Sequence, residues 1–496
     1  MADLTLTGKN PTALKVDALV VGTCSTSDGA AVVADQLPEA LVRQIETLAP
    51  RLGVTGAADE VRRLPAGDDV AADVLVLAGL GERAADGTFA HEVLRSAAGA
   101  ATRELAGTDT VAVALPAVDE DELAAVVEGA LLGAYTYTRY RSGKDQKSAV
   151  GSIQVVTPFA RSGRAKSAVA RGEVLAAAVH GTRDLVNAAP NDLFPAAFAD
   201  AAKAAAKGVK GIKLTVLDDK QLAAGGYGGL VGVGQGSSRG PRLVKLTYTP
   251  AKAAAKVAIV GKGITFDTGG ISLKPPAGMP TMKSDMAGAA AVLHTVLAAA
   301  RLGLPVAVTG YLCLAENMPG GNAQRPADVI TIRGGKTVEV TNTDAEGRLV
   351  MADGLVAAVE DGHDVVLDIA TLTGAQMVAL GNRTSGVMGT DEVRDEVKAA
   401  ADDAGEAFWP MPMPAELKAG LKSTVADMVN SAPSRWGGML FAAHFLKEFV
   451  GETPWAHLDI AGPSYNEGSS FGYTPAGGTG VGVRTMLAFL EGRAGL

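Results

Sequence analysis

Short apolar runs alternate with helical patterns through the first 160 residues. Four runs are rich in β-branched residues and have the length of strands, covering residues 14–21, 73–80, 110–115 and 153–157. The segment 120–135 has apolar residues at helical spacing. Alternating strands and helices are typical of a layered α/β domain, so we expect residues 1–160 to form a small N-terminal α/β domain.

Residues 161–189 are predicted to form a connecting helix, because the segment is rich in alanine and charged residues and ends just before Pro190. From residue 190 onward, apolar strands again alternate with long Ala- and Leu-rich helices. The expected strands cover residues 257–260, 306–314, 329–332, 365–370 and 457–460. This pattern predicts a larger α/β domain over 190–496, with a central parallel or mixed sheet flanked by helices.

The N-terminal sequence, the cysteines and the apolar segments indicate the cellular compartment of the protein. The chain begins Met1-Ala-Asp without a basic and apolar leader pattern, and its two cysteines, Cys24 and Cys313, lie far apart among apolar and small residues. The longest apolar helical stretch, residues 286–300, is shorter than the roughly 20 residues of a membrane span. We therefore expect a cytoplasmic protein without a membrane segment.

The negative charge is concentrated in the N-terminal region. Residues 1–160 contain 22 acidic and 13 basic residues, which accounts for the whole formal net charge of −9. A general nucleic-acid surface is therefore disfavoured, with a local basic patch as the alternative.

Polar residues follow the strand at 257–260 in a glycine-rich segment. Lys262, Asp267 and Lys274 lie there at intervals of five and seven residues, and the glycines let the backbone bend so that these side chains can converge. A second acid, Asp285, precedes the helix at 286–300. Taken alone, Asp285 would most simply be a helix N-cap.

A third group of polar residues lies at 338–349, where a predicted strand leads into a helix over 350–359. Residues two apart in an extended segment point the same way, so Asp344, Glu346 and Arg348 can face one pocket. A solvated loop with local ion pairs is the alternative.

These segments together would bring four carboxylates into one pocket, those of Asp267, Asp285, Asp344 and Glu346. Such a cluster is prohibitive in a low dielectric unless cations neutralise it. Two divalent ions would balance the charge, and oxygen ligands suit Zn²⁺, Mn²⁺, Mg²⁺ or Co²⁺. Paired ions of this kind hydrolyse peptides and phosphates, so the pattern favours a two-metal hydrolytic site.

Other catalytic constellations receive little support from the sequence. The six histidines are scattered and no two of them have metal-ligand spacing. No Gly-x-x-x-x-Gly-Lys-Ser/Thr motif is present. The glycine-rich run 228–236 matches a dinucleotide loop only loosely, which gives a nucleotide role little support.

The octapeptide 342–349, Asn-Thr-Asp-Ala-Glu-Gly-Arg-Leu, resembles the signature sequence of the leucyl aminopeptidase family. Further segments resemble motifs of that family in the same order, at 183–187, 190–192, 232–239, 261–270, 284–290 and 457–462. The resemblance covers residues 180–490 densely. The first 160 residues agree mainly in length and in a layout similar to a macro domain.

The resemblance implies the ligands of two metal ions. Lys262, Asp267, Asp285 and Glu346 would bind one ion and Asp267, Asp344 and Glu346 the other, with Asp267 and Glu346 bridging. The amine of Lys262 would have to be neutral, with a pKa far below its usual value. Zn²⁺ and Mn²⁺ are the expected ions, with Mg²⁺ and Co²⁺ as alternatives.

The resemblance also implies an aminopeptidase mechanism. The α-amine of a peptide would bind the tighter metal and the scissile carbonyl the other, beside a bridging water. Lys274 would stabilise the oxyanion, and Arg348 would hold a bicarbonate that acts as general base. The amides near that bicarbonate would be those of Ala345, Gly347 and Leu372. The pocket for the first side chain would involve Met282, Thr371, Gly374, Ala461 and Ser464.

Two positions depart from many relatives. Ser464 replaces a larger apolar residue, which leaves open whether leucine or another, mainly apolar, residue is preferred. Trp436 stands where small residues are common and has no assigned role. The family resemblance implies peptide substrates and a homohexamer. It also implies DNA binding through the first domain in some bacterial members, a second role that the acidic balance disfavours here.

Overall fold

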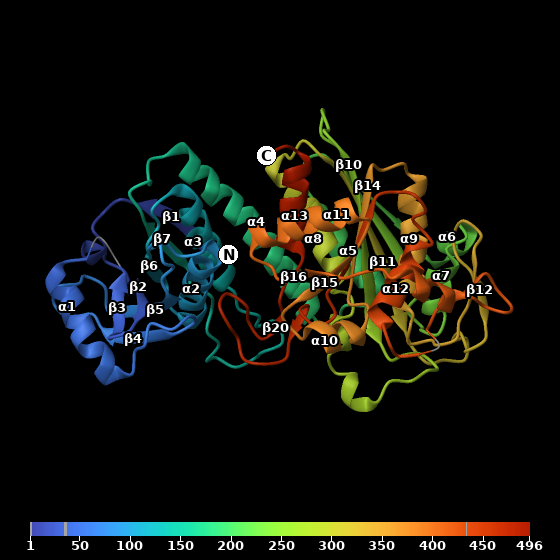
Figure 1. Ribbon diagram of the computed structural model, residues 1–496, viewed down its shortest axis with the longest axis horizontal. Coiled ribbons are helices and arrows are strands. Elements are labelled where there is room, and N and C mark those ends of the chain that lie inside the picture. Colours follow the sequence, from blue (N-terminus) through green and yellow to red (C-terminus); the bar gives the residue numbers. More distant parts are fainter. Residues whose placement is uncertain (1, 34–36, 433) are drawn as a thin grey trace. The chain divides into compact units, whose positions relative to one another are not determined.

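The computed structural model describes residues 2–33, 37–432 and 434–496 (Figure 1). The chain divides into two units. The first comprises the chain up to His180 together with Glu467–Ala476, and the second comprises Gly181–Asn466 and Gly477–Leu496. The prediction of two α/β domains is confirmed, although a short segment far along the chain groups with the N-terminal unit.

Within the described residues, the first unit is built on a seven-stranded sheet of order β1-β7-β6-β2-β5-β4, with β3 paired to β2. Its strands β1 to β7 are Asp3–Thr7, Ala18–Thr26, Gly29–Val33, Val61–Pro65, Val74–Glu82, Thr110–Ala114 and Ser152–Val156. The predicted strands correspond to β2, β5, β6 and β7. The structure adds β1, β3 and β4, and β4 is largely exposed, so it carries little apolar signal.

Helices α1 Glu39–Leu48, α2 His91–Glu104 and α3 Glu120–Gly133 accompany this sheet. Helices α2 and α3 approach closely, since a β-carbon at Gly129 would lie 2.0 Å from the Arg95 carbonyl oxygen. The segment Glu467–Ala476 is tied to the same unit. The Tyr473 hydroxyl donates to Glu92 at 2.6 Å, and the Gly472 amide donates to Asp59 at 2.7 Å.

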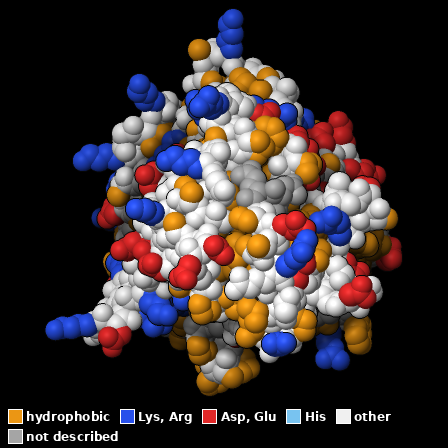
Figure 2. Space-filling model, turned by 90° about the vertical axis from the view of Figure 1, so that its left-hand side faces the viewer, with side chains coloured by type: hydrophobic (Ala, Val, Ile, Leu, Met, Phe, Trp, Pro, Cys, Tyr) orange, Lys and Arg blue, Asp and Glu red, His pale blue; other side chains and the backbone are white. Residues whose placement is uncertain are grey.

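Figure 2 shows one face of the molecule, on which Lys and Arg side chains are interspersed with Asp and Glu. The predicted connecting helix is α4, Gly163–Asn187. The boundary between the two units falls inside this helix, after His180.

An eight-stranded sheet of order β16-β15-β18-β14-β10-β11-β9-β8 forms the centre of the second unit within the described residues. Its strands in chain order are β8 Ile212–Leu217, β9 Arg242–Tyr248, β10 Lys256–Asp267, β11 Ala307–Asn317, β14 Val365–Ala370, β15 Ser385–Gly389, β16 Phe408–Pro410 and β18 Trp455–Asp459. The four strands β18, β14, β10 and β11 are parallel, whereas β9 runs antiparallel to β11. The prediction of a mixed sheet is confirmed.

Helices lie on both faces of this sheet (Figure 1). They are α5 Pro195–Ala206, α6 Asp219–Ala224, α7 Gly228–Gly234, α8 Ala287–Leu302, α9 Gly347–Glu360, α10 Gly374–Leu380, α11 Asp391–Ala404, α12 Gly438–Lys447 and α13 Val483–Arg493. One large apolar core joins one face of β10 and β11 to α9 and α12, through residues such as Val260, Cys313, Leu349 and Phe445.

Short strands complete the second unit: β12 Val329–Thr331, β13 Thr337–Glu339, β17 Met428–Val429, β19 Tyr465–Asn466 and β20 Gly477–Gly478. The strand predicted at 329–332 is therefore not part of the central sheet, because β12 pairs with β13, and β13 with β17, in a separate small sheet.

The apolar helical segment is longer than predicted, since Met282–Leu302 has the length and composition of a membrane span. However, 78% of its apolar window is buried inside the protein, as expected for a core helix.

Candidate metal centre

Lys262 and Asp267 both lie on β10, which continues to Asp267 instead of ending at residue 260 as predicted. On a regular strand, residues five apart point to opposite faces. The pairing of β10 with β11 shifts between Ile264 and Asp267, which pair with Ala315 and Asn317. Three steps on β10 thus match two on β11, and this bulge turns Asp267 to the face of Lys262.

The Asp267 carboxylate is held in place by two donors. The Gly269 amide and the Asn317 side-chain amide both donate to Oδ1 at 2.8 Å. Gly269 has a φ of +85°, a left-handed conformation that favours glycine. The other carboxylate oxygen lies 2.8 Å from the Lys274 ammonium. Asp267 is thus fixed on the protein side and faces Lys274 on the other.

Lys262 is buried among acids. Its Nζ lies 2.8 Å from Asp285 Oδ1 and 2.9 Å from Glu346 Oε1, and it donates to the Thr371 carbonyl at 2.9 Å. Asp285 also accepts from the Thr371 hydroxyl at 2.7 Å. The N-cap of α8 is Met286, so the N-cap interpretation of Asp285 is wrong. Asp285 points to the cluster because a short 3₁₀ turn precedes the helix.

The segment that carries Asp344, Glu346 and Arg348 is not extended as predicted. Glu346 has helical angles, φ −77° and ψ −35°, and α9 begins at Gly347. The three side chains therefore do not share a face by strand alternation. A turn in which the Asp344 amide donates to the Asn342 side chain at 2.9 Å leads into the helix instead. Asp344 and Glu346 reach the cluster from this turn and the start of the helix.

The four carboxylates gather in one cluster, as predicted. Oxygens of Asp267, Asp344 and Glu346 lie within 4.8 Å of one another. Lys274 contacts two of them, with Nζ 2.8 Å from Asp267 and 2.5 Å from Asp344. Among the described residues, buried oxygens of Asp285 (Oδ2) and Glu346 (Oε2) accept no hydrogen bond. Four carboxylates face two ammonium groups here, and buried acceptors without donors fit a site for divalent cations.

Burial and the neighbouring charges of the cluster shift the pKa values of its side chains. Burial raises the pKa of Glu346 to about 8, with Asp267 acting in the same direction and Lys262 against it. Burial also raises the pKa of Asp285 to about 6. Burial alone would lower the pKa of Lys262, but Asp285 and Glu346 outweigh it and raise that pKa. The protein alone therefore favours protons on a cluster whose negative charge is in excess.

Arg348 lies in the first turn of α9 and is buried. Its Nη1 donates to the Asn430 carbonyl at 2.9 Å, while its Nε has no partner among the described residues. Burial lowers the pKa of Arg348 to about 10. The Leu372 amide, predicted to serve the same anion, donates to Asp459 Oδ1 at 3.2 Å.

The residues of the predicted side-chain pocket lie on different elements and differ in burial. Thr371 contacts Lys262 and Asp285, and Gly374 is the exposed first residue of α10. Ser464 is buried and donates to the Ala461 carbonyl at 3.2 Å. Met282 begins the turn before Asp285. Their joint role as a substrate pocket stays a prediction.

Asn430 was not predicted from the sequence. Its side-chain amide donates to the carbonyls of Asn342 at 2.7 Å and Ala345 at 3.3 Å, and its Oδ1 accepts from the Thr341 amide at 2.8 Å. It thus clamps the loop that carries Asp344, and its carbonyl holds Arg348. No motif surrounds Asn430, so only the structure reveals it. Trp436, a few residues later, is 74% exposed and lies beside Arg435.

Comparison with known proteins matches this chain to one family. The model of the cytosol aminopeptidase family catalytic domain matches residues 180–487, and that of the N-terminal domain matches residues 20–144. A probable cytosol aminopeptidase of Micrococcus luteus is 55% identical over 99% of this chain and 98% of its own length. One from Streptomyces griseus is 50% identical, again covering 99% of this chain and 98% of its own.

Two solved structures share the whole fold. The bottromycin maturation enzyme BotP in complex with Mn is 38% identical, with a TM-score of 0.84, covering 97% of this chain and 100% of its own. A mutant of tomato leucine aminopeptidase is 31% identical, with a TM-score of 0.85, covering 99% and 96%. These matches extend along the full chain and confirm the family that the motif at 342–349 predicted. The chain belongs to the cytosol aminopeptidase family and is an aminopeptidase.

Proposed function

We propose that this aminopeptidase removes N-terminal residues from peptides with two divalent metal ions per chain. The buried carboxylate cluster carries the proposal. Oxygens of Asp267, Asp344 and Glu346 lie within 4.8 Å of one another, and among the described residues Asp285 and Glu346 each have an oxygen without a donor. Lys262, Asp267, Asp285 and Glu346 would hold one ion, and Asp267, Asp344 and Glu346 the other. Zn²⁺ or Mn²⁺ are the expected ions, with Mg²⁺ or Co²⁺ as alternatives, and the related BotP binds Mn.

Metal ions at this site would supply Lewis acidity, lowering the pKa of a water nucleophile and polarising the scissile carbonyl. Lys274 is the side chain placed to act on the substrate directly. Its side chain is 18% exposed, and its ammonium lies against Asp267 and Asp344 at the open side of the cluster. From there it can donate to the oxyanion that develops when the carbonyl is attacked.

Arg348 is proposed to hold a bicarbonate ion that acts as general base. The ion would lie near the start of α9, where the amides of Ala345 and Gly347 and the helix dipole favour an anion. The unpaired Nε of buried Arg348 supports an added partner there. The Leu372 amide could join only by giving up its hydrogen bond to Asp459.

The proposed substrates are peptides with leucine or another, mainly apolar, N-terminal residue. Their first side chain would enter the pocket formed by Met282, Thr371, Gly374, Ala461 and Ser464. A free α-amine is required in this proposal, so acetyl-Leu-p-nitroanilide should not be hydrolysed. Hydrolysis at a rate near that of Leu-p-nitroanilide would contradict the exopeptidase geometry.

Metal analysis combined with kinetics tests the two-metal assignment. The wild-type protein should hold two divalent ions per chain and lose activity on chelation. Glu346→Ala and Asp344→Ala should retain at most a few per cent of the activity with an unchanged circular dichroism spectrum. The matched control is Glu360→Ala, at the far end of α9 and paired with Arg333 on the surface, which should keep normal activity. Substantial activity in Glu346→Ala would refute the assignment.

We further propose a cytoplasmic homohexamer. Light scattering on the purified protein tests the oligomer, and a mass other than six chains would contradict it. DNA binding by the first unit is the less favoured second role, since residues 1–160 contain 22 acidic and 13 basic residues. A gel shift at physiological salt would reveal it.

A further inference from the structure

A cavity of about 590 Å³ lies in the second unit, away from the carboxylate cluster. It is lined by Pro190 and Asn191, by residues 236–239, by Phe266 and by part of the segment 316–319. Glu316 precedes Asn317 on β11, and successive strand side chains point to opposite faces. Because Asn317 contacts Asp267, the cavity lies on the reverse face of the strands that carry the metal ligands.

The cavity unites two segments that the proposed mechanism does not use. The segments 190–192 and 232–239 both resemble family motifs, yet neither supplies a residue to the carboxylate cluster. They are far apart in sequence but meet at this cavity through Pro190, Asn191 and residues 236–239. Its volume falls in the range of small-molecule sites, roughly 300–1,000 Å³.

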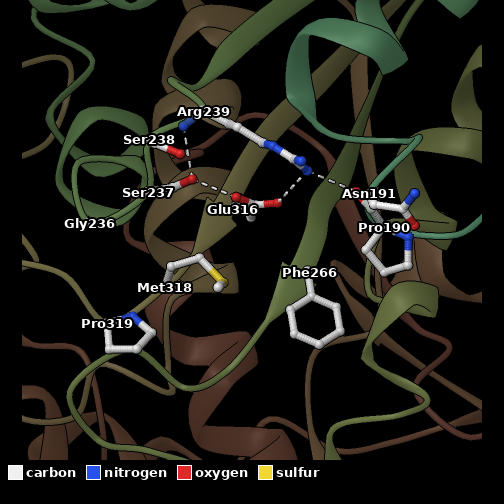
Figure 3. Close-up of a pocket in the computed structure, with 10 residues that line it drawn as sticks. All are labelled: Pro190, Asn191, Gly236, Ser237, Ser238, Arg239, Phe266, Glu316, Met318 and Pro319. Carbon is white, nitrogen blue, oxygen red and sulfur yellow. Dashed lines mark hydrogen bonds and ion pairs between the residues drawn. The ribbon is translucent and has the colours of Figure 1, made fainter.

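Two opposite charges lie side by side in the cavity (Figure 3). The Arg239 guanidinium is 3.6 Å from the Glu316 carboxylate, an ion pair longer than a hydrogen bond. The Glu316 side chain is 8% exposed and accepts from the Ser237 hydroxyl, while the Arg239 side chain is 36% exposed. Each charge is thus only partly satisfied by the protein.

Both charges are held in fixed positions. Arg239 stacks on the Phe194 ring at 4.5 Å and donates to the Pro190 carbonyl at 3.1 Å. Figure 3 shows the polar groups in a row, with Met318, Phe266 and Pro319 on the opposite side. The cavity therefore combines one guanidinium, one carboxylate and an apolar wall.

We propose that this cavity binds a free α-amino acid as its zwitterion. The ammonium and carboxylate of an α-amino acid are attached to the same carbon, and neighbouring carboxylate and guanidinium groups are their natural partners. The ligand carboxylate pairs with Arg239, its ammonium pairs with Glu316, and an apolar side chain lies against Phe266 and Met318.

The same charges disfavour other ligands. A phosphate or other simple anion would meet the Glu316 carboxylate, and a simple amine would meet the Arg239 guanidinium. A wholly apolar ligand would desolvate both charges without replacing the lost interactions. An aminopeptidase releases free amino acids, so a ligand of this class is present wherever the enzyme works.

Equilibrium dialysis of the holoenzyme with radiolabelled L-leucine tests the proposal. Leucine should bind to the wild-type protein and to Glu346→Gln, whose lesion lies in the carboxylate cluster. Arg239→Gln and Glu316→Gln should weaken this binding roughly tenfold or more, the effect of losing one charge-assisted hydrogen bond. The matched control is Arg242→Gln, an arginine outside the cavity that pairs with Asp219 at 3.5 Å, which should bind normally.

Leucine fragments provide a test that needs no variant. Isopentylamine lacks the carboxylate and 4-methylpentanoate lacks the ammonium, so each should bind the wild-type cavity roughly tenfold more weakly than leucine, or worse. The proposal is overturned if wild-type protein binds no leucine, or if binding disappears in Glu346→Gln and survives in Arg239→Gln. It is also overturned if either fragment competes as well as leucine. None of these outcomes would contradict the two-metal proposal, which is tested by metal content and activity.

Discussion

The side chain of Lys262 passes so close to Gly347 that a β-carbon at position 347 would lie 2.5 Å from Lys262 Cε and 2.7 Å from Nζ. Only glycine leaves room there for the lysine to reach Asp285 and Glu346. Gly347→Ala should therefore displace the Lys262 amine and lower kcat/KM by about 10²-fold, as small misplacements in active sites do. Steady-state kinetics on Leu-p-nitroanilide measures this loss.

Gly492→Ala is the control for that substitution. Gly492 lies in the last turn of α13, and no atom would approach a β-carbon there within 4 Å. Alanine should leave activity unchanged and stabilise the helix by up to about 1 kcal/mol. Wild-type kcat/KM in Gly347→Ala would show that Lys262 can move without consequence.

Lys274 and Arg348 should have separable roles. If Lys274 stabilises the oxyanion directly, Lys274→Ala should lower kcat by about 10²- to 10³-fold, the effect of removing one oxyanion donor. Arg348 positions an exchangeable base, so Arg348→Ala should cost less, and its residual rate should respond to added bicarbonate differently from wild type.

Metal content decides how those kinetics are interpreted. Neither side chain is a proposed ligand, so Lys274→Ala and Arg348→Ala should both bind two ions per chain. Loss of an ion in Lys274→Ala, or an unchanged kcat, would be incompatible with the oxyanion role.

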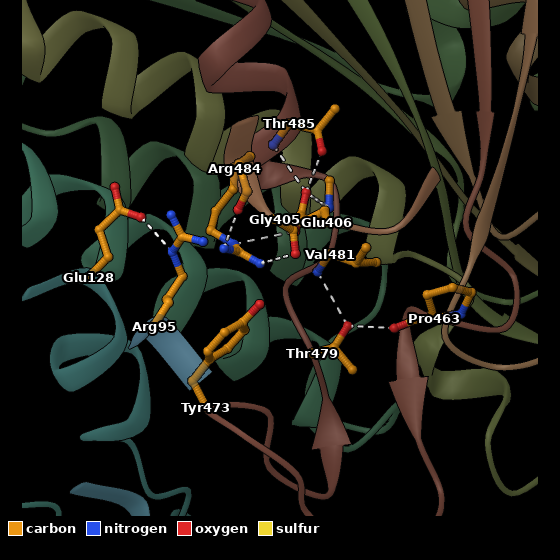
Figure 4. A network of polar contacts seen from close by, with 12 residues as sticks. Arg95, Glu128, Gly405, Glu406, Pro463, Tyr473, Thr479, Val481, Arg484 and Thr485 are labelled. Carbon is orange, nitrogen blue, oxygen red and sulfur yellow. Dashed lines mark hydrogen bonds and ion pairs between the residues drawn. The ribbon is translucent and has the colours of Figure 1, made fainter. Parts of the chain in front are cut away.

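Glu406 anchors the C-terminal helix. Its buried carboxylate accepts from the Gly482 amide at 3.1 Å and from the Thr485 amide at 3.0 Å, at the start of α13 (Figure 4). Glu406→Ala leaves these buried donors unpaired, which should lower the free energy of unfolding by about 2–3 kcal/mol. Glu392→Ala, an exposed residue in the first turn of α11, should cost less than about 1 kcal/mol in the same denaturant titration. Equal losses in the two variants would exclude the anchoring role.

His294 should make the protein sensitive to acid. Burial, with Arg301 acting in the same direction, lowers the pKa of His294 from its ordinary 6.5 to about 4. Between these pH values His294 is protonated in the unfolded chain but neutral in the folded chain. The free energy of unfolding therefore falls as the pH falls from 6.5 to 4. His294→Gln lacks this proton and should lose less stability over that interval. Parallel denaturation midpoints in the two proteins across the interval would refute the assignment.

The apolar runs predicted the sheet centres well, because buried parallel strands such as Val365–Ala370 are nearly continuous apolar segments. Edge strands were missed where their residues are exposed, as in Val61–Pro65. The limits of β10 were also missed, because Lys262, Thr265 and Asp267 interrupt the apolar pattern although all three are buried in the fold. Buried polar residues thus gave a long strand the sequence pattern of a loop.

The gathering of the four acids was predictable from the sequence, and metal ions as their counterions stay a prediction. The geometry of the cluster was not predictable. The bulge before Asp267 and the helical start at Glu346 depend on pairing with β11 and on packing of α9. Asn430 clamps the Asp344 loop from 86 positions away in the chain, a long-range contact that no local pattern encodes.

Because the segment Glu467–Ala476 belongs to the first unit, the two units cannot be separated by dividing the chain at one position. The catalytic family match at 180–487 runs straight through it, yet the Gly472 amide and the Tyr473 hydroxyl find their acceptors in Asp59 and Glu92. A gene divided near residue 180 would place these partners on different polypeptides. Exchange of the N-terminal unit between relatives by recombination therefore has to bring a matching ten-residue loop from near the other end of the gene.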